Sequence, residues 1–295
     1  MRILVIGGSG LVGSHVLREA ETRGCTAFGT FRRYAVPGLL PLDLDDSAGL
    51  VRLLESTRPD WVVHAAGWTW VDGCEKDPAR AMRENCEQPA ELARCCVQRG
   101  IRLAYFSSSY VFNGTAPSYG EHDFPDPINV YGRSKLAAEK AIAEITGQSA
   151  LIPRVICVWG REAQQKNFVY QVLRAVREGK KMTIPSDQRG NPTWAGDIAA
   201  WILDLVQAAE SGVWNLAGEF PDWTREQWMR SILDGLRASG GDASLLEKWS
   251  YQTKPSDALA QTASRPLNAG VNIGRIQARF PRALRHPSTI ECLLA

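Results

Sequence analysis

What this 295-residue sequence lacks excludes several classes of protein. No stretch approaches the roughly 18 consecutive apolar residues of a membrane-spanning helix, and the first residues do not form the basic, apolar and small-residue regions of a signal peptide. The formal net charge is only +2 and the basic residues are dispersed, so attraction to nucleic acid or to an acidic membrane is not expected. These absences predict a cytoplasmic protein with neither a nucleic-acid nor a membrane partner.

Patterns that bind metals or build a hydrolytic nucleophile are missing as well. The seven cysteines show no Cys-x-x-Cys pair and no Cys/His ligand spacing. We interpret them as buried free thiols in a reducing compartment. None of the four histidines pairs recognisably with a Ser or Cys nucleophile, and His15 is expected to face outward from the first helix. No metal site is predicted.

What the first half of the chain does contain is a regular alternation of short apolar runs and helical periodicity. The apolar runs predict strands at Arg2–Ile6, Cys25–Phe31, Trp61–His64, Arg102–Ser107 and Ala150–Val155. Helices are predicted between them, at 11–23, 47–57, 78–99 and 130–146. Such alternation is typical of βαβ units. We therefore predict an α/β protein built on a Rossmann-type doubly wound parallel sheet.

After Gly160 the pattern is less regular. Helices are predicted at 168–178 and 195–208, a strand at 213–216 and a loop-rich stretch at 239–266. Thr224 followed by Gln227 is a capping box that begins a further helix. We expect a smaller C-terminal substrate-binding lobe beside the carboxyl edge of the sheet, where ligands of open α/β sheets bind. The predicted division is a core of residues 1–160 and a lobe of residues 161–295, with some lobe elements returning to the core.

A glycine-rich turn joins the first strand to the first helix. In the run Gly7-Gly8-Ser9-Gly10-Leu11-Val12-Gly13, Gly7, Gly10 and Gly13 provide the tight turn, the close approach to pyrophosphate and the tight helix–strand contact. The helix N-terminus then presents free N–H groups and the positive end of its dipole to phosphates. We therefore expect a dinucleotide at Gly7, Gly10, Leu11, Val12 and Gly13.

The end of the second strand discriminates between the two nicotinamide cofactors. An acidic residue at this place bonds the adenosine ribose of NAD, whereas an Arg accommodates the 2′-phosphate of NADP. The strand ends in Arg32-Arg33 with no carboxylate nearby, and a guanidinium can grip a phosphate through two parallel hydrogen bonds. Arg32 and Arg33 therefore predict NADP(H). NAD(H) stays open, because two solvated surface arginines would give the same pattern.

Tyr131 and Lys135 are the residues that indicate the reaction. They are four residues apart and so lie on one face of a predicted helix. We expect the Lys135 ammonium to lower the pKa of the phenol from near ~10, and such a Tyr can protonate a carbonyl oxygen as hydride arrives at the carbon. Ser108 ends the preceding strand and can donate to the same oxygen. These three predict a reductase, with Tyr131 and Lys135 also beside the cofactor ribose.

Together these motifs resemble the extended short-chain dehydrogenase/reductases, and specifically the dTDP-4-dehydrorhamnose reductase family. The resemblance runs nearly end to end. Besides the glycine turn and the Tyr131–Lys135 block, it is carried by Leu42-Asp43-Leu44, His64–Gly67, Ser107–Gly114, Asn167-Phe168, Gly190–Thr193 and Arg265–Asn268.

The family likeness implies roles for further positions. Cofactor contacts are implied at Asp43, Leu44, Ala65, Ala66, Gly67 and Pro153. Asn167, Phe168 and Arg265 fall where such relatives hold a nucleotide sugar, and an Arg suits a diphosphate; a surface arginine is the alternative for Arg265. Asn85 matches a helical Asn that supports the active-site backbone in related folds, and a satisfied buried Asn is the alternative.

Three departures from the family pattern surround the carbonyl site. Ser109 stands where the family has an Asp beside the catalytic hydroxyl, Cys157 replaces a Trp, and Trp70 adds bulk in the loop after His64. We expect Ser109 and Trp70 to line the substrate site. The departures leave hydride chemistry intact and open the question of which ketone is reduced.

Three functions are consistent with these patterns. The leading one is an NADPH-dependent reductase of a keto group, that of a dTDP-4-keto-6-deoxy sugar. The altered pocket motivates a second, a reductase of a non-nucleotide ketone or aldehyde in secondary metabolism. The third is not catalytic: the regulatory subunit of methionine adenosyltransferase resembles the same family and binds NADP as a structural ligand. The stereochemistry of the product and the oligomeric state, including a homodimer, stay open.

Overall fold

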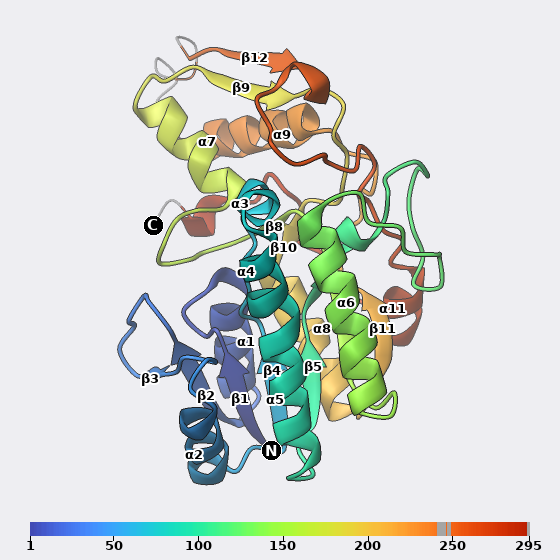
Figure 1. Cartoon of the computed structure of the whole chain (residues 1–295). Coiled ribbons are helices and arrows are strands. Elements are labelled where there is room, and N and C mark those ends of the chain that lie inside the picture. The colour runs from blue at the N-terminus through green and yellow to red at the C-terminus, as the bar shows by residue number, and fades with distance from the viewer. Residues whose placement is uncertain (241–245, 247–248, 294–295) are drawn as a thin grey trace.

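The computed structural model describes residues 1–240, 246 and 249–293 and is an α/β protein (Figure 1). Its main sheet has the strand order β3-β2-β1-β4-β5-β7-β11, and every pairing along this path is parallel. The strands are β1 (Arg2–Ile6), β2 (Thr26–Phe31), β3 (Leu40–Pro41), β4 (Trp61–His64), β5 (Arg102–Tyr105), β7 (Leu151–Val155) and β11 (Gly212–Asn215). The order reverses between β1 and β4, as in a Rossmann sheet. The predicted fold class is confirmed.

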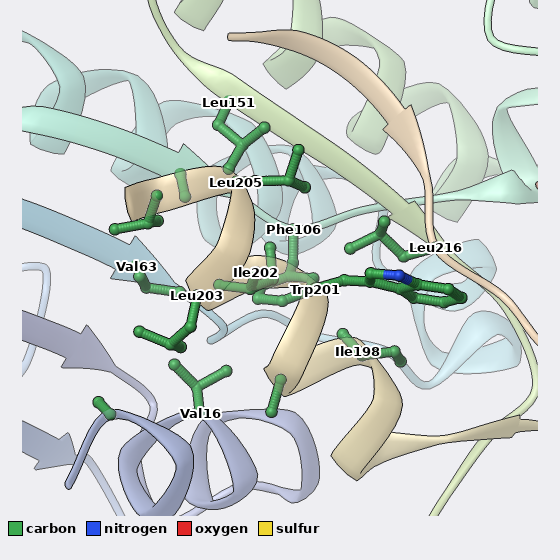
Figure 2. Close-up of a cluster of buried hydrophobic side chains, with 14 of the residues drawn as sticks. Val16, Val63, Phe106, Leu151, Ile198, Trp201, Ile202, Leu203, Leu205 and Leu216 are labelled. Atoms are coloured by element: carbon green, nitrogen blue, oxygen red, sulfur yellow. The ribbon is translucent and has the colours of Figure 1, made fainter. Parts of the chain in front are cut away.

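Helices cover both faces of the sheet because alternate strand residues are apolar on opposite sides. On one face, side chains of α1 (Leu11–Thr22) and α8 (Ala195–Gln207) pack against Ile3, Val5, Val63 and Phe106. Figure 2 shows this core, in which Leu203 of α8 lies next to Val16 of α1. On the other face, α2 (Ser47–Thr57), α5 (Gln88–Val97) and α6 (Val130–Ile145) pack against the alternate set that includes Leu4, Val62 and Tyr105.

A second, smaller core lies beyond the carboxyl ends of the strands. It is built from α7 (Phe168–Arg177), β9 (Met182–Pro185), α9 (Arg225–Ala238) and β12 (Tyr251–Lys254), at the top of Figure 1. Its buried side chains include Trp228, Ile232 and Ile184, and Trp159 of the strand β8 (Val158–Trp159) joins them. The capping box of Thr224 and Gln227 is present at the start of α9. Two other elements of the second half lie with the main sheet instead: β11 is one of its strands, and α8 packs on its face.

The other elements of the described chain are short. Between β4 and α5 lie α3 (Val71–Lys76), α4 (Pro78–Met82) and the π-helical turn η1 (Arg83–Glu87). The remaining ones are β6 (Ser107–Ser108), the 3₁₀ turns η2 (Ser109–Val111), η3 (Ser256–Ala258) and η4 (Glu291–Leu293), β10 (Thr193–Trp194) and α11 (Gly274–Arg279). The π-helical turn interrupts the single helix predicted for 78–99, and β12 lies inside the stretch predicted as loop.

A proline divides the strand that was predicted over Arg102–Ser107. The carbonyls of Ala150 and Arg154 accept hydrogen bonds from Gly212 of β11 and from Leu216 directly after it. Because the backbone polar groups of successive strand residues point to alternate sides, those of Pro153 point toward β5. Because proline has no N–H to donate to the ladder, β5 pairs with β7 at one residue pair only, and pairing resumes with β6. Pro153 is thus buried within β7. Its missing N–H explains why pairing with β7 is interrupted just before Ser108.

The tightest contact in the glycine turn gives a test of the fold. A Cβ on Gly13 would lie 2.2 Å from the Gly7 carbonyl oxygen, so Gly13→Ala forces the backbone of the turn to shift. We expect a loss of about 1–3 kcal/mol in the free energy of unfolding, measured in urea, although alanine favours the helix intrinsically. Gly120→Ala is the matched control, because its Cβ would meet nothing closer than 3.8 Å. Equal stability of the two variants would contradict this packing.

Candidate active site

The glycine turn lies against the loop that follows β4, at the point where the strand order reverses. Gly7 has φ of +85°, and a Cβ there would lie 2.8 Å from the backbone nitrogen of Ala66. The Gly7 N–H donates to the Thr30 hydroxyl (3.1 Å), and Gly10, which makes no side-chain cap, precedes α1. The first N–H groups of α1 are thereby left for a ligand. The structure brings Gly7, Gly10, Leu11, Val12 and Gly13 together with Ala65, Ala66 and Gly67.

The two arginines after β2 have different surroundings. Arg32 Nη2 lies 3.1 Å from a carboxylate oxygen of Glu84, whose side chain is 6% exposed. Glu84 also accepts from Arg80 Nε at 2.9 Å, and the Arg80 guanidinium lies 4.0 Å from the centre of the Trp68 ring. Arg33 is exposed. No carboxylate follows β2 in the sequence, but the fold brings Glu84 from a distant part of the chain beside Arg32.

Ser108, Tyr131 and Lys135 converge as predicted from their positions. Ser108 ends β6, and its hydroxyl accepts from the Tyr110 N–H at 3.2 Å. The same hydroxyl lies close enough to the Tyr131 phenol to lower its pKa. One helical turn after Tyr131, Lys135 is 4% exposed. Its Nζ donates to the Phe106 carbonyl (2.6 Å) and lies 4.2 Å from the centre of the Tyr105 ring. The three side chains thus line the carboxyl end of the sheet.

Burial controls the protonation of this group. It raises the pKa of Tyr131 well above its ordinary value, and the hydrogen bond from Ser108 opposes this only in part. Burial lowers the pKa of Lys135 to about 7, against the raising effect of the Glu139 carboxylate one turn later. The expectation that Lys135 lowers the pKa of Tyr131 is wrong for the protein by itself, since burial dominates. The phenol keeps its proton, which is the form that a proton donor needs.

Asn85 ties the site to the π-helical turn η1. Its side-chain oxygen accepts from the Trp68 N–H (2.8 Å), and its Nδ2 donates to the Trp68 carbonyl and to Ser134 Oγ, both at 3.1 Å. Tyr105 OH donates to the Asn85 carbonyl at 2.8 Å. A Cβ on Gly67 would lie 3.1 Å from Asn85 Oδ1. Asn85 therefore holds the loop after β4 beside α6, and π-helical turns are frequent at such sites.

Gly132 allows the catalytic helix to approach the strand that carries Ser108. A Cβ at this position would lie 2.1 Å from the Tyr110 carbonyl oxygen. Because Tyr110 lies in η2, directly after Ser108, a larger residue would push α6 away and separate Ser108 from Tyr131. The sequence contained this glycine between the two predicted catalytic residues, but nothing in its spacing identified the contact.

The residues predicted to bind substrate fall in different environments. Trp70 is 59% exposed at the start of α3, whereas Ser109 is completely buried, so we do not propose Ser109 as a substrate contact. Asn167 precedes α7 and donates to the Gly160 carbonyl (2.8 Å). Phe168 packs on Trp228 in the smaller core.

Arg265 is neither a free surface arginine nor an unpaired cation. Its side chain is 10% exposed, and its Nη2 lies 3.0 Å from Asp72 of α3. Its Nη1 donates to the Ala263 carbonyl (2.8 Å), and the Ala263 N–H in turn donates to Asp72. Arg265 therefore fixes the 263–267 segment to α3, which leaves it fewer donors for a diphosphate.

The remaining predicted positions are distributed around the glycine turn and the sheet. Asp43 is exposed and caps the Asp45 N–H, Leu44 packs at the edge of the core, and Pro153 lies inside β7. His15 does not face outward: it is 8% exposed, bonded to the Arg161 carbonyl and packed edge-on against Trp194, and burial lowers its pKa to about 4. Among the described residues there is no group of His, Cys, Asp and Glu that could hold a metal, and no helix long and apolar enough to span a membrane.

Sheet order, glycine turn and the Ser108–Tyr131–Lys135 group together define a protein of the short-chain dehydrogenase/reductase class, in its extended form with a smaller C-terminal core. The chain belongs to the family described as RmlD substrate binding domain, whose model matches residues 1–289.

Individual relatives agree with this membership. The chain is 34% identical over 297 residues to a dTDP-4-dehydrorhamnose reductase of Burkholderia thailandensis, covering 95% of this chain and 93% of that one. It is 30% identical over 278 residues to methionine adenosyltransferase 2 subunit beta of Danio rerio, covering 94% and 84%. The solved structure of a dTDP-4-dehydrorhamnose reductase from Bacillus anthracis, in complex with NADP, has a TM-score of 0.84 at 21% identity over 97% of this chain and 95% of that one.

The buried ammonium predicts a specific dependence of stability on pH. Because the pKa of Lys135 is 10.5 when exposed and about 7 in the fold, the unfolded chain binds an extra proton between these values. The free energy of unfolding therefore rises with pH between these two values. Below pH 7 the lysine is charged in both states, and the folded protein is destabilised by the full penalty of burying that charge. Lys135→Met removes the titration, so the free energy of unfolding of the wild type relative to the variant should increase by a few kcal/mol from pH 7 to 10.

Urea unfolding of both proteins at several pH values measures this difference. The contributions of groups that titrate in both proteins cancel when the two free energies of unfolding are subtracted. Lys140→Met, an exposed position on the same helix, is the matched control and should show no such change. A difference between wild type and Lys135→Met that stays constant over the window would contradict the burial of a charge at this site.

Proposed function

We propose that this protein is an NADPH-dependent reductase that transfers hydride to a keto group, that of a dTDP-4-keto-6-deoxy sugar. The observation that carries the proposal is the buried Tyr131 phenol beside Ser108, one helical turn from the buried Lys135. Family membership supports the sugar, because relatives that align over nearly the whole chain are dTDP-4-dehydrorhamnose reductases.

The residues around the glycine turn fit a dinucleotide. The turn has no side chain at Gly7, Gly10 or Gly13, and a Cβ at Gly7 or Gly13 would strike neighbouring backbone. We assign the pyrophosphate to the first N–H groups of α1, and the rest of the cofactor to Asp43, Leu44 and the loop Ala65–Gly67. Lys135 would hold the nicotinamide ribose. NADPH supplies the hydride when it is bound.

Arg32 and Arg33 are the residues that we assign to the 2′-phosphate of NADP. Arg33 is exposed and Arg32 shares Glu84 with Arg80. Because Arg80 holds the same carboxylate, Arg32 can turn one donor to a phosphate without leaving Glu84 unpaired. That the Bacillus anthracis structure is a complex with NADP supports NADP as the cofactor.

Protonation of the carbonyl oxygen is the step that the protein's own side chains perform. Ser108 and Tyr131 would both donate to this oxygen, which orients the carbonyl and stabilises the charge that develops on it. Tyr131 then gives up its proton. The Lys135 ammonium, one turn away, would stabilise the phenolate that remains, and the Phe106 carbonyl keeps Lys135 in place.

The smaller core is where we place the substrate. Trp70, Asn167 and Phe168 lie at the boundary between it and the sheet, and Arg265 braces this boundary through Asp72. We propose that the part formed by residues 161–295, apart from α8 and β11, selects the sugar. The exposed Trp70 and the substitution Cys157 keep a non-nucleotide ketone as the alternative substrate.

A non-catalytic function is favoured by one observation, the 30% identity to methionine adenosyltransferase 2 subunit beta of Danio rerio. The presence of Ser108, Tyr131 and Lys135 at one place argues for chemistry instead, since a structural nucleotide needs no buried proton donor. Co-purification with a catalytic partner, together with the absence of NADPH oxidation, would favour the regulatory function.

Removing one hydroxyl tests the reductase directly. Tyr131→Phe should lower NADPH oxidation with a dTDP-4-keto-6-deoxy sugar by at least ~100-fold, because the proton donor is lost. NADPH binding, followed by fluorescence, should be nearly unchanged. Tyr34→Phe, at a tyrosine that is 44% exposed, is the matched control and should keep full activity. Turnover by Tyr131→Phe within a few-fold of the wild type would overturn the assigned chemistry.

A further inference from the structure

Arg225, at the start of α9, differs from the other two arginines of its helix. Arg230 pairs with Glu226 at 2.6 Å, and Arg237 pairs with Asp234 at 2.8 Å. Among the described residues, the half-buried Arg225 side chain makes no hydrogen bond and no ion pair. Its guanidinium instead lies 5.3 Å from the centre of the Phe168 ring and 5.1 Å from that of Trp228.

Arg225 lies near enough to two groups beside the active site to affect their pKa values. It acts on the Tyr110 phenol and on the Cys157 thiol, opposing the rise in pKa that burial causes in both groups. Tyr110 is the neighbour of the proton donor, because its ring meets that of Tyr131 edge-on with centres 5.8 Å apart. Arg225 therefore lies on the lobe side of the boundary, and Tyr131 lies on the sheet side with Tyr110 between them.

The second cation that acts on Tyr110 is already neutralised. Arg265 also influences that phenol, but its guanidinium is paired with Asp72. Arg225 is thus the cation at this boundary for which the described residues provide no counter-charge. Contacts with aromatic faces hold a guanidinium in place, and they leave its N–H donors available to a ligand.

A planar guanidinium with free donors is suited to two oxygens of a phosphoryl group. The cofactor pyrophosphate is assigned to the N-terminus of α1, in the sheet, whereas Arg225 belongs to the smaller core together with Phe168. An anion at Arg225 would therefore belong to the other reactant. In the proposed reaction that reactant carries a diphosphate.

We propose that Arg225 binds the diphosphate of the nucleotide-sugar substrate, and so selects nucleoside diphosphate sugars over neutral ketones. This proposal rests on the proposed function. Arg225 is a binding residue for the substrate and takes no part in proton transfer. The rings of Phe168 and Trp228 orient the Arg225 guanidinium. Phe168 would thus contribute to substrate binding indirectly, by holding Arg225.

Calorimetric titration of the full-length protein, saturated with NADP, with dTDP and with thymidine tests the assignment. Wild-type protein should bind dTDP at least ~30-fold more tightly than thymidine, because charge-assisted bidentate bonds are strong. Arg225→Gln should lower the affinity for dTDP by about 10- to 100-fold and leave that for thymidine unchanged. Arg225→Lys, which keeps the charge and loses the fork, should fall between the two.

Arg230→Gln is the matched control, since this residue lies on the same helix and is paired with Glu226. Thermal unfolding of each variant separates lost binding from lost folding. With the keto sugar, Arg225→Gln should raise the KM for the sugar about as much as it weakens dTDP binding, with little change in kcat or in the KM for NADPH.

Unchanged dTDP affinity in a folded Arg225→Gln variant would overturn the inference even if the wild type reduces the sugar. An absence of dTDP binding by the wild type would overturn it as well. If the wild type binds dTDP through Arg225 but oxidises no NADPH with any keto sugar, the diphosphate site is supported and the proposed reductase function fails.

Discussion

The ammonium of Lys135 is the constraint on which the active site depends. A positive charge that is 4% exposed must be compensated by neighbours, and the fold provides the Phe106 carbonyl, the face of Tyr105 and, one turn later, the Glu139 carboxylate. The Phe106 carbonyl is available because β4 ends at His64, whose carbonyl accepts from the Phe106 N–H. Glu139 in turn is held by Arg154 of β7 at 2.7 Å. The cost of burying the charge is therefore distributed over three strands and one helix.

A similar distribution of charge defines the boundary between the sheet and the smaller core. Asp72 and Arg265 neutralise each other and fix a C-terminal segment to α3. Among the described residues, the Arg225 guanidinium contacts the rings of Phe168 and Trp228 and forms no ion pair. The first pair is structural, and Arg225 is the residue that we propose for an anion. The two ends of the bound reactants are thus assigned to different parts of the chain, with Tyr131 and Tyr110 between them.

Much of the fold could be predicted from the sequence, because strand and helix periodicity is local. The bounds of β1, α2 and β4 agree with the predicted ranges, and Tyr131 and Lys135 share a helix face because four residues make about one turn. The errors concern pairs distant in sequence. Glu84 reaches Arg32 across 52 residues, and the packing of His15 on Trp194 depends on an element far along the chain. Spacing carries no information on such contacts.

The same limit applies to protonation and to the substrate site. Whether Lys135 or burial sets the pKa of the Tyr131 phenol depends on how deeply that phenol is buried. The four-residue spacing of the two residues carries no information on burial. Ser109 was expected to line the substrate site because it stands beside the catalytic hydroxyl, yet it is completely buried. Arg225 carried no motif. Its place over the Phe168 and Trp228 rings, with no carboxylate of the described residues paired to it, emerges only in three dimensions.

The central claim is that hydride passes to the keto carbon while a proton passes to its oxygen. The most direct measurement uses NADPH with deuterium at the transferable position of the nicotinamide ring and a dTDP-4-keto-6-deoxy sugar, with mass spectrometry of the product. We expect one deuterium on the new carbinol carbon for each NADPH consumed, with the hydroxyl proton coming from solvent. A product without deuterium, or no consumption of NADPH, would contradict the account.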